Sequence, residues 1–136
     1  MTRRSLTAAD YGVLADFRYA LRRFQAFSEA QAAALGLTPQ QHQALLAIKA
    51  APAEAATVGY LADRLVLKPH SASGLVDRLA SLGLIERRTG SLDRRRALLR
   101  LTDKAEVVLS DLSLIHGEEI RRLRPLLIDL LGKLGE

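Results

Sequence analysis

Apolar residues recur at helical spacing through most of the chain, and the first stripe lies near the N-terminus. It follows Thr7, a residue type that caps helices, and its members alternate in steps of three and four: Leu14, Phe17, Leu21 and Phe24. Such a seam favours packing against another helix, which here suits a helix of a second subunit. The pattern predicts a long N-terminal helix that ends at Gly36.

A second helix is predicted where the sequence reads GLTPQQHQALLAIKA. Thr38 is a capping residue, Pro39 suits the first helical position, and Gln41 completes a capping box. We expect three residues of this helix to form its buried stripe: Leu45, Leu46 and Ile48.

Two more helices follow. Thr57 caps a short one that carries Leu61 and Leu65, and Pro69 begins another that Gly83 ends. The apolar residues of the latter fall within an arc of about 120° on a helical wheel: Ala72, Leu75, Val76, Leu79 and Leu82. Its opposite face and flanks are small and polar: His70, Ser71, Ser73, Gly74, Asp77, Arg78 and Ser81. Such a face lets a helix approach another surface closely and hydrogen-bond there.

The pattern then changes to two short β-like runs, LIERR and RALLRL, joined by TGSLDR. Thr102 caps a long helix that carries four apolar residues at helical spacing: Val108, Leu109, Leu112 and Ile115. We expect Pro125 to break or kink this helix at Arg124, and a closing helix, PLLIDLLGKL, to follow.

Composition narrows the class of protein. The 136 residues fit a single domain, 1–136, with 49% apolar and 26% charged residues, as in ordinary globular proteins. The sequence contains no run of eighteen apolar residues, so no membrane span is expected. The N-terminus lacks the pattern of a secretory signal. The cytoplasm is therefore the expected compartment. The absence of cysteine excludes disulfides, thiolate metal sites and thiol-based redox sensing.

Charge is unevenly distributed. The net charge is +5, and residues 57–101 contain nine basic and four acidic residues, so this third of the chain carries the whole excess. Such asymmetry is typical of a module that binds a polyanion, with a neutral scaffold on either side. A solvated basic surface without a partner is the plainer alternative.

The order of elements supports the first reading. A short helix, a tight turn and a polar-faced helix make a helix-turn-helix, and a hairpin directly after it makes a winged helix. The fold class expected is therefore mainly α with a small β-hairpin wing. Three arginines, Arg94 to Arg96, lie at the predicted wing tip, and DNA phosphate is the anion that would neutralise them.

The segment SASGLVDRLASLGLIERRTGSLDRRRALLRLT resembles the core signature of the MarR family of bacterial transcription regulators. The matching parts are LVDRL (Leu75 to Leu79), the LGLIERR that follows, and a wing with Asp93, Arg95 and a final Leu101-Thr102. The resemblance implies a homodimer whose two winged helices bind a palindromic operator in double-stranded DNA. Residues 37–102 would form the DNA-binding lobe, flanked by dimerisation helices at 7–35 and 103–136.

The resemblance also implies a function and a ligand class. We expect a repressor released by a small aromatic or lipophilic effector, with no cofactor. A compact segment between His116 and Leu126 departs from the longer acidic connector of many members, so the shape of any pocket stays open. The candidates for lining a ligand pocket are Tyr11, His42 and Leu46.

Site residues follow from these patterns. In the resemblance, Arg95 inserts into the minor groove, while Asp93 orders the wing or orients an arginine. Asp77 is repelled by phosphate, so we expect it to pair with an arginine. The remaining DNA-binding candidates are Arg64, Lys68, His70, Ser71, Ser73, Gly74, Arg78, Arg94 and Arg96, and the dimerisation candidates are Leu14, Phe17, Leu21, Leu126, Leu127, Leu130 and Leu131.

Two other classes of function remain open. The winged helix would serve as a protein-interaction module if its basic wing gripped an acidic partner, without binding an operator. An enzyme is disfavoured because the sequence has no nucleophile elbow, glycine-rich phosphate loop or acidic pair. The three histidines, His42, His70 and His116, share no metal-ligand spacing, so no metal site is expected.

Overall fold

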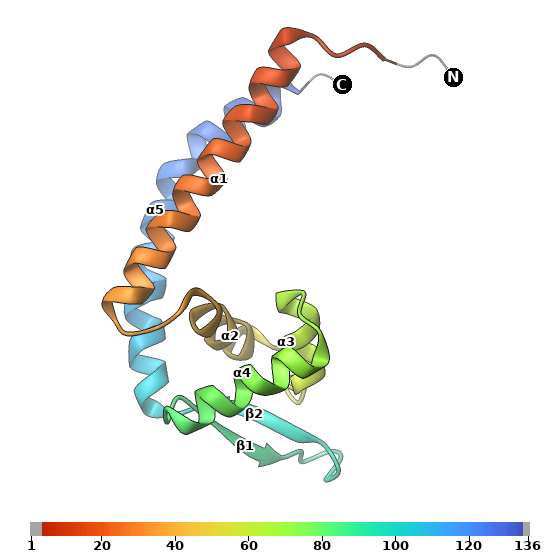
Figure 1. The fold of residues 1–136 in the computed structure, drawn as a ribbon, viewed down its shortest axis with the longest axis vertical. Helices are drawn as coiled ribbons and strands as arrows, with labels where there is room; N and C mark the ends of the chain where they lie inside the picture. The colour runs from red at the N-terminus through yellow and green to blue at the C-terminus, as the bar shows by residue number, and fades with distance from the viewer. Residues whose placement is uncertain (1–3, 135–136) are drawn as a thin grey trace.

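The computed structural model describes residues 4–134, which form two long helices and a smaller lobe (Figure 1). The elements in chain order are α1 (Ala8–Ala34), α2 (Pro39–Ala50), α3 (Val58–Leu65), α4 (Pro69–Ser81), β1 (Ile85–Thr89), β2 (Ala97–Leu101) and α5 (Asp103–Lys133). Helices α1 and α5 lie side by side, run in opposite directions and project from the lobe of α2, α3, α4 and the β1–β2 hairpin. We call this helix pair the stalk. The mainly helical fold with one hairpin confirms the predicted fold class.

Four threonines begin helices as the sequence predicts. At Thr7 and Thr38 the capping boxes are complete, with Asp10 and Gln41 at the third helical position. At Thr57 and Thr102 the hydroxyl oxygen accepts the backbone N–H three residues later, at 3.1 and 3.3 Å. Each cap satisfies an N–H that the helix itself leaves unpaired.

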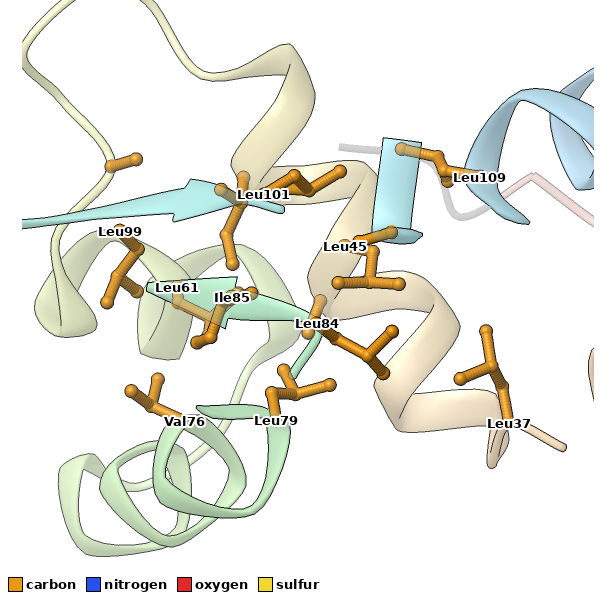
Figure 2. Close-up of a cluster of buried hydrophobic side chains, with 14 of the residues drawn as sticks. Leu37, Leu45, Leu61, Val76, Leu79, Leu84, Ile85, Leu99, Leu101 and Leu109 are labelled. Carbon is orange, nitrogen blue, oxygen red and sulfur yellow. The ribbon is translucent and has the colours of Figure 1, made fainter. Parts of the chain in front are cut away.

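The core of the lobe lies between the helices and the hairpin (Figure 2). Leu45 from α2, Leu61 from α3 and Leu79 from α4 are fully buried and meet the inward side chains of both strands. Strands β1 and β2 pair antiparallel, with Ile85 opposite Leu101. Because α4 and both strands share this core, the wing has a fixed position relative to α4.

Two apolar positions differ from the sequence predictions. Leu46 is 41% exposed, because its direction on α2 points it away from the core that Leu45 and Ile48 enter. Leu130, predicted to serve dimerisation, is only 4% exposed, because the antiparallel helix α1 covers it within the same chain.

The expected helix break at Pro125 is also absent, and α5 continues through it to Lys133. The proline removes one N–H, which leaves the carbonyl of Arg121 without its helical donor. Both residues are exposed, so solvent can bond that carbonyl. Packing of α5 along α1 on either side of this turn holds the helix together. Within residues 4–134, no helix combines the length and apolarity needed to cross a bilayer.

Candidate nucleic-acid interface

Helix α4 has one buried and one fully exposed face. Ala72, Val76 and Leu79 are buried in the lobe. The five DNA-binding candidates on the helix are all exposed: His70, Ser71, Ser73, Gly74 and Arg78. A Cβ added to Gly74 would meet no atom within 4 Å, so the fold itself does not require glycine there. Because glycine has no side chain, nothing projects from α4 at this position, and another surface can approach the helix backbone closely.

Two basic candidates flank the turn between α3 and α4: Arg64 in the last turn of α3 and Lys68 at the N-cap of α4, both exposed. Between them, Val66 has φ 54° and is 91% exposed. A β-branched residue in the left-handed region is a conformational outlier of the kind found at functional sites. The sequence offered no sign of it, because valine is not a residue expected in this conformation.

The wing tip is a tight turn over residues 90–96, closed by backbone hydrogen bonds. Gly90 N–H donates to the carbonyl of Arg96 at 2.9 Å, and Arg96 N–H donates to the carbonyl of Asp93 at 3.1 Å. Gly90 is required here, because a Cβ would lie 2.6 Å from the carbonyl oxygen of Asp93. The turn presents Arg94, Arg95 and Arg96 to solvent.

Asp93 bonds Arg95 three times. Its carboxylate accepts the backbone N–H of Arg95 at 3.0 Å, the side-chain Nε–H at 3.2 Å and a terminal N–H at 3.4 Å. The side-chain bond from Arg95, followed by the backbone bond, lowers the pKa of Asp93. The Arg95 side chain nevertheless stays 91% exposed, so the pair orients the guanidinium without removing it from solvent.

The arginines form a basic basin on one side of the wing. This basin has a volume of about 220 Å³ and is lined by Arg87, Arg88, Thr89, Arg94, Arg95, Arg96 and Ala97. Arg87 also donates to Asp77 of α4, which is the arginine pairing expected for that aspartate. Because Asp77 lies on the exposed face of α4, this pair joins the polar face of α4 and the wing into one continuous surface.

Glu54, in the loop between α2 and α3, is a further polar residue at the wing. Its carboxylate accepts the backbone N–H of Ser91 at 3.1 Å and also the Ser91 hydroxyl. Residues 37 positions apart in the sequence thus meet at the wing tip. Glu54 was not among the residues expected from the sequence, because no local pattern indicates such a distant partner.

The residues of the guessed ligand pocket do not meet within the chain. Tyr11 is exposed and belongs to the first turn of α1. The start of α1 is at the far end of the stalk from the lobe (Figure 1). His42 is buried against the ring of His116. Leu46 lies in a shallow hollow between α2 and α5, with Lys49 and Glu106. A pocket of these three residues in one subunit is therefore wrong.

The stalk carries a different pair of hollows. One, of about 170 Å³, is almost wholly apolar and is lined by Phe17, Ala20, Leu21, Phe24, Ile120, Leu123 and Leu127. The other, of about 290 Å³, is lined by Tyr19, Ala20, Arg23, Phe24, Phe27, Glu119, Leu123 and Leu126. Among the dimerisation candidates, Leu14, Phe17, Leu21, Leu126 and Leu131 are each at least 40% exposed, and Leu127 is half-buried.

No cluster of three or more His, Cys, Asp or Glu side chains suited to a metal ion occurs within residues 4–134. The polar groups that gather on the lobe are instead hydroxyls, an imidazole and guanidinium groups. This donor set is chemically suited to phosphate and to base edges.

Known proteins share this fold. Residues 35–96 match the model of the MarR family, and no curated protein matches the chain. Among solved structures, a MepR variant from S. aureus bound to an oligodeoxyribonucleotide is 21% identical, with a TM-score of 0.68 over 96% of this chain and 100% of that one.

Two further structures are similar. AbsC, a MarR family transcriptional regulator from Streptomyces coelicolor, is 18% identical, with a TM-score of 0.70 over 96% of this chain and 99% of that one. CouR from Rhodococcus jostii, bound to p-coumaroyl-CoA, is 23% identical, with a TM-score of 0.66 over 81% of this chain and 79% of that one. At these identities the likeness concerns the fold.

Proposed function

We propose that this chain, of which residues 35–96 match the model of the MarR family, is a MarR-type homodimeric repressor that binds a palindromic operator in double-stranded DNA. It is a winged-helix transcription regulator and not an enzyme. The observation that carries the proposal is the continuous surface formed by the polar face of α4 and the arginine-rich wing, joined by the Asp77–Arg87 pair.

In this proposal α4 enters the major groove. The hydroxyls of Ser71 and Ser73 and the imidazole of His70 bond base edges or phosphates, and Gly74 lets the helix backbone approach closely. Arg64, Lys68 and Arg78 bind phosphates on either side, which positions the helix without selecting sequence. Arg95 enters the adjacent minor groove, with Arg94 and Arg96 beside the phosphates.

Dimerisation through the stalk supplies the second half of the site. The exposed apolar residues of α1 and α5 are too many to face water alone in a stable monomer. A two-fold dimer presents two α4 helices to successive major grooves, about 34–36 Å apart, which corresponds to half-sites about ten base pairs apart.

Release by a small aromatic acid is the regulation that we propose. The stalk hollow of about 290 Å³ is near the lower size limit for small-molecule sites. Phe24 and Phe27 supply aromatic walls, and Arg23 supplies a cation for a carboxylate. Titrating benzoate into the protein–operator complex should release DNA from wild type and do so less effectively with Arg23→Ala.

Selection from a library of randomised duplexes tests DNA reading itself. The proposal expects enrichment of inverted repeats with half-site centres about ten base pairs apart. Recovery of no preferred sequence would instead favour the alternative, a winged-helix module that grips an acidic protein. The basic wing alone fits both functions, whereas the small polar face of α4 favours the first.

A further inference from the structure

The loop between α2 and α3, residues 51–57, is bonded to the wing at two places. In the middle of β2, the backbone N–H of Leu99 donates to the carbonyl of Ala56 at 2.7 Å; Leu99 itself points into the core (Figure 2). At the tip, Glu54 accepts both the backbone N–H and the hydroxyl of Ser91. The wing is therefore held along its length, and Glu54 is the contact nearest to the arginines.

The backbone around Glu54 is arranged for this contact. Glu54 has φ 64°, in the left-handed region that side chains rarely adopt. The turn around it is closed by Ala55 N–H to the carbonyl of Pro52, at 3.0 Å. On the wing side, Gly90 admits the carboxylate, because a Cβ there would lie 3.2 Å from Glu54 Oε2. An unfavourable conformation on one side and a glycine on the other bring the two groups together.

Among residues 4–134, no cation lies within ion-pair distance of the Glu54 carboxylate, although Arg88 and Arg100 line the same hollow. Its hydrogen bonds go to the neutral Ser91. A carboxylate beside a phosphate-binding surface repels DNA, so its presence there costs affinity unless it performs another task.

We propose that Glu54 is a positioning residue for DNA binding, which holds Ser91 and thereby sets the direction in which the wing tip presents Arg95. This inference rests on the proposed function. Ser91 lies four residues before Arg95 in a turn whose ends are closed by the Gly90–Arg96 and Arg96–Asp93 bonds. Fixing Ser91 fixes the start of that turn, while the Asp93 carboxylate orients the guanidinium at its end.

Whether replacing Glu54 raises or lowers the affinity for DNA distinguishes a positioning role from a purely electrostatic one. Removing a negative charge near phosphates tightens DNA binding if charge alone matters. Removing a positioning contact weakens binding, because the wing must then be ordered when DNA binds. We expect Glu54→Ala to weaken binding by roughly five- to tenfold, which is within the range for the loss of one ordinary hydrogen bond.

The matched control is Glu86→Ala. Glu86 is an exposed acid on β1 of the same wing, opposite Arg100, so its removal changes the charge equally and leaves the tip contact intact. We expect Glu86→Ala to bind at least as tightly as wild type. Glu54→Gln should recover most of the affinity, because its amide oxygen can accept the Ser91 N–H and its amide N–H can donate to the Ser91 hydroxyl.

The experiment titrates the full-length variants against one selected duplex at fixed salt and maps protection of the DNA. Glu54→Ala should lose protection of the minor groove at the edges of the site and keep protection of the major groove. Ser91→Ala should show a smaller loss, and the double variant should bind no worse than Glu54→Ala. If Glu54→Ala fails to fold, Ser91→Ala and Glu54→Gln decide the question.

Two failures are distinguishable. If wild type selects no duplex, the proposed function fails and the role of Glu54 with it. If wild type binds its duplex while Glu54→Ala binds as tightly as Glu86→Ala, with unchanged minor-groove protection, only the positioning role of Glu54 is overturned.

Discussion

The imidazole rings of His42 and His116 lie 4.8 Å apart between centroids, where α2 meets the stalk. His116 is fully bonded in its neutral form: Nδ1–H donates to the carbonyl of Leu112 at 2.6 Å, and Nε2 accepts the hydroxyl of Ser28 at 2.7 Å. We assign this tautomer because a carbonyl only accepts. The Nδ1 of His42 is buried and has no hydrogen-bond partner among residues 4–134.

This pair predicts that acid destabilises the fold. Burial, and then the neighbouring His116, lower the pKa of His42 below its ordinary value of 6.5. Below that value the unfolded chain binds a proton that the folded chain resists, so the free energy of unfolding should fall as pH drops from 6.5 through the lowered pKa. Urea unfolding of wild type between pH 7.5 and 5 measures the slope.

His42→Leu removes the titrating group and should flatten this part of the curve. His70→Ala is the control, because His70 is exposed on α4 and its loss should leave the slope unchanged. Parallel curves for wild type and His42→Leu would show that His42 is not the group responsible.

Arg95→Ala should weaken DNA binding by roughly 1–3 kcal/mol, the scale of a good specific contact. The loss should be largest for sites flanked by A/T, where a narrow minor groove attracts arginine most strongly. Thermal stability should move little, because the Arg95 side chain is 91% exposed. Fluorescence anisotropy with one operator at fixed salt measures the affinity.

Two further variants test whether the loss of affinity in Arg95→Ala comes from the position of this arginine on the wing or only from its charge. Asp93→Ala should cause a smaller loss in the same direction, because Arg95 remains but loses its orienting partner. Arg122→Ala removes the same charge from exposed α5, away from the wing, and should leave operator affinity nearly unchanged. Equal losses for Arg95→Ala and Arg122→Ala would mean that net charge, and not the wing, determines binding.

Leu21→Glu should convert the proposed dimer to monomers. Leu21 is 44% exposed on α1 and lines the apolar hollow of the stalk, so a charge there would be buried without a partner in a dimer. DNA affinity should fall by roughly 100-fold or more, because the two half-sites are no longer linked. Light scattering at micromolar concentration measures the mass, with Val66→Glu in the α3–α4 turn as the control that stays dimeric.

Peroxide should not release the protein from DNA directly. The chain contains no cysteine, and Met1, its one methionine, lies outside the described residues. No side chain of the lobe can therefore follow the thiol or thioether route of oxidation. Release of purified protein from its operator by mild peroxide would contradict this expectation.

Features governed by neighbours in sequence were predictable. The helix starts at Thr7, Thr38, Thr57 and Thr102 follow from side chains that bond a backbone group three residues away. The buried face of α4 follows from its periodicity. In each case the physical cause lies within one turn of helix, which is the range that a pattern of residues encodes.

Features governed by distant contacts were not. The sequence predicted a helix break at Pro125, but contacts with α1 stabilise α5, and these contacts cannot be seen in the local sequence. Leu130 is covered by α1 of its own chain, and Leu46 is left outside the core, for reasons set by how whole helices cross. Glu54 and Ser91 are 37 residues apart and meet only because the hairpin folds back over the α2–α3 loop.

The most direct test of the central claim, that this surface reads duplex DNA, is the salt dependence of binding to a selected palindrome and to a scrambled duplex of the same composition. We expect tighter binding to the palindrome at every salt concentration. We also expect log affinity to fall linearly with log salt, by about 0.9 for each phosphate neutralised. Equal affinity for both duplexes, or binding that salt does not weaken, would contradict the claim.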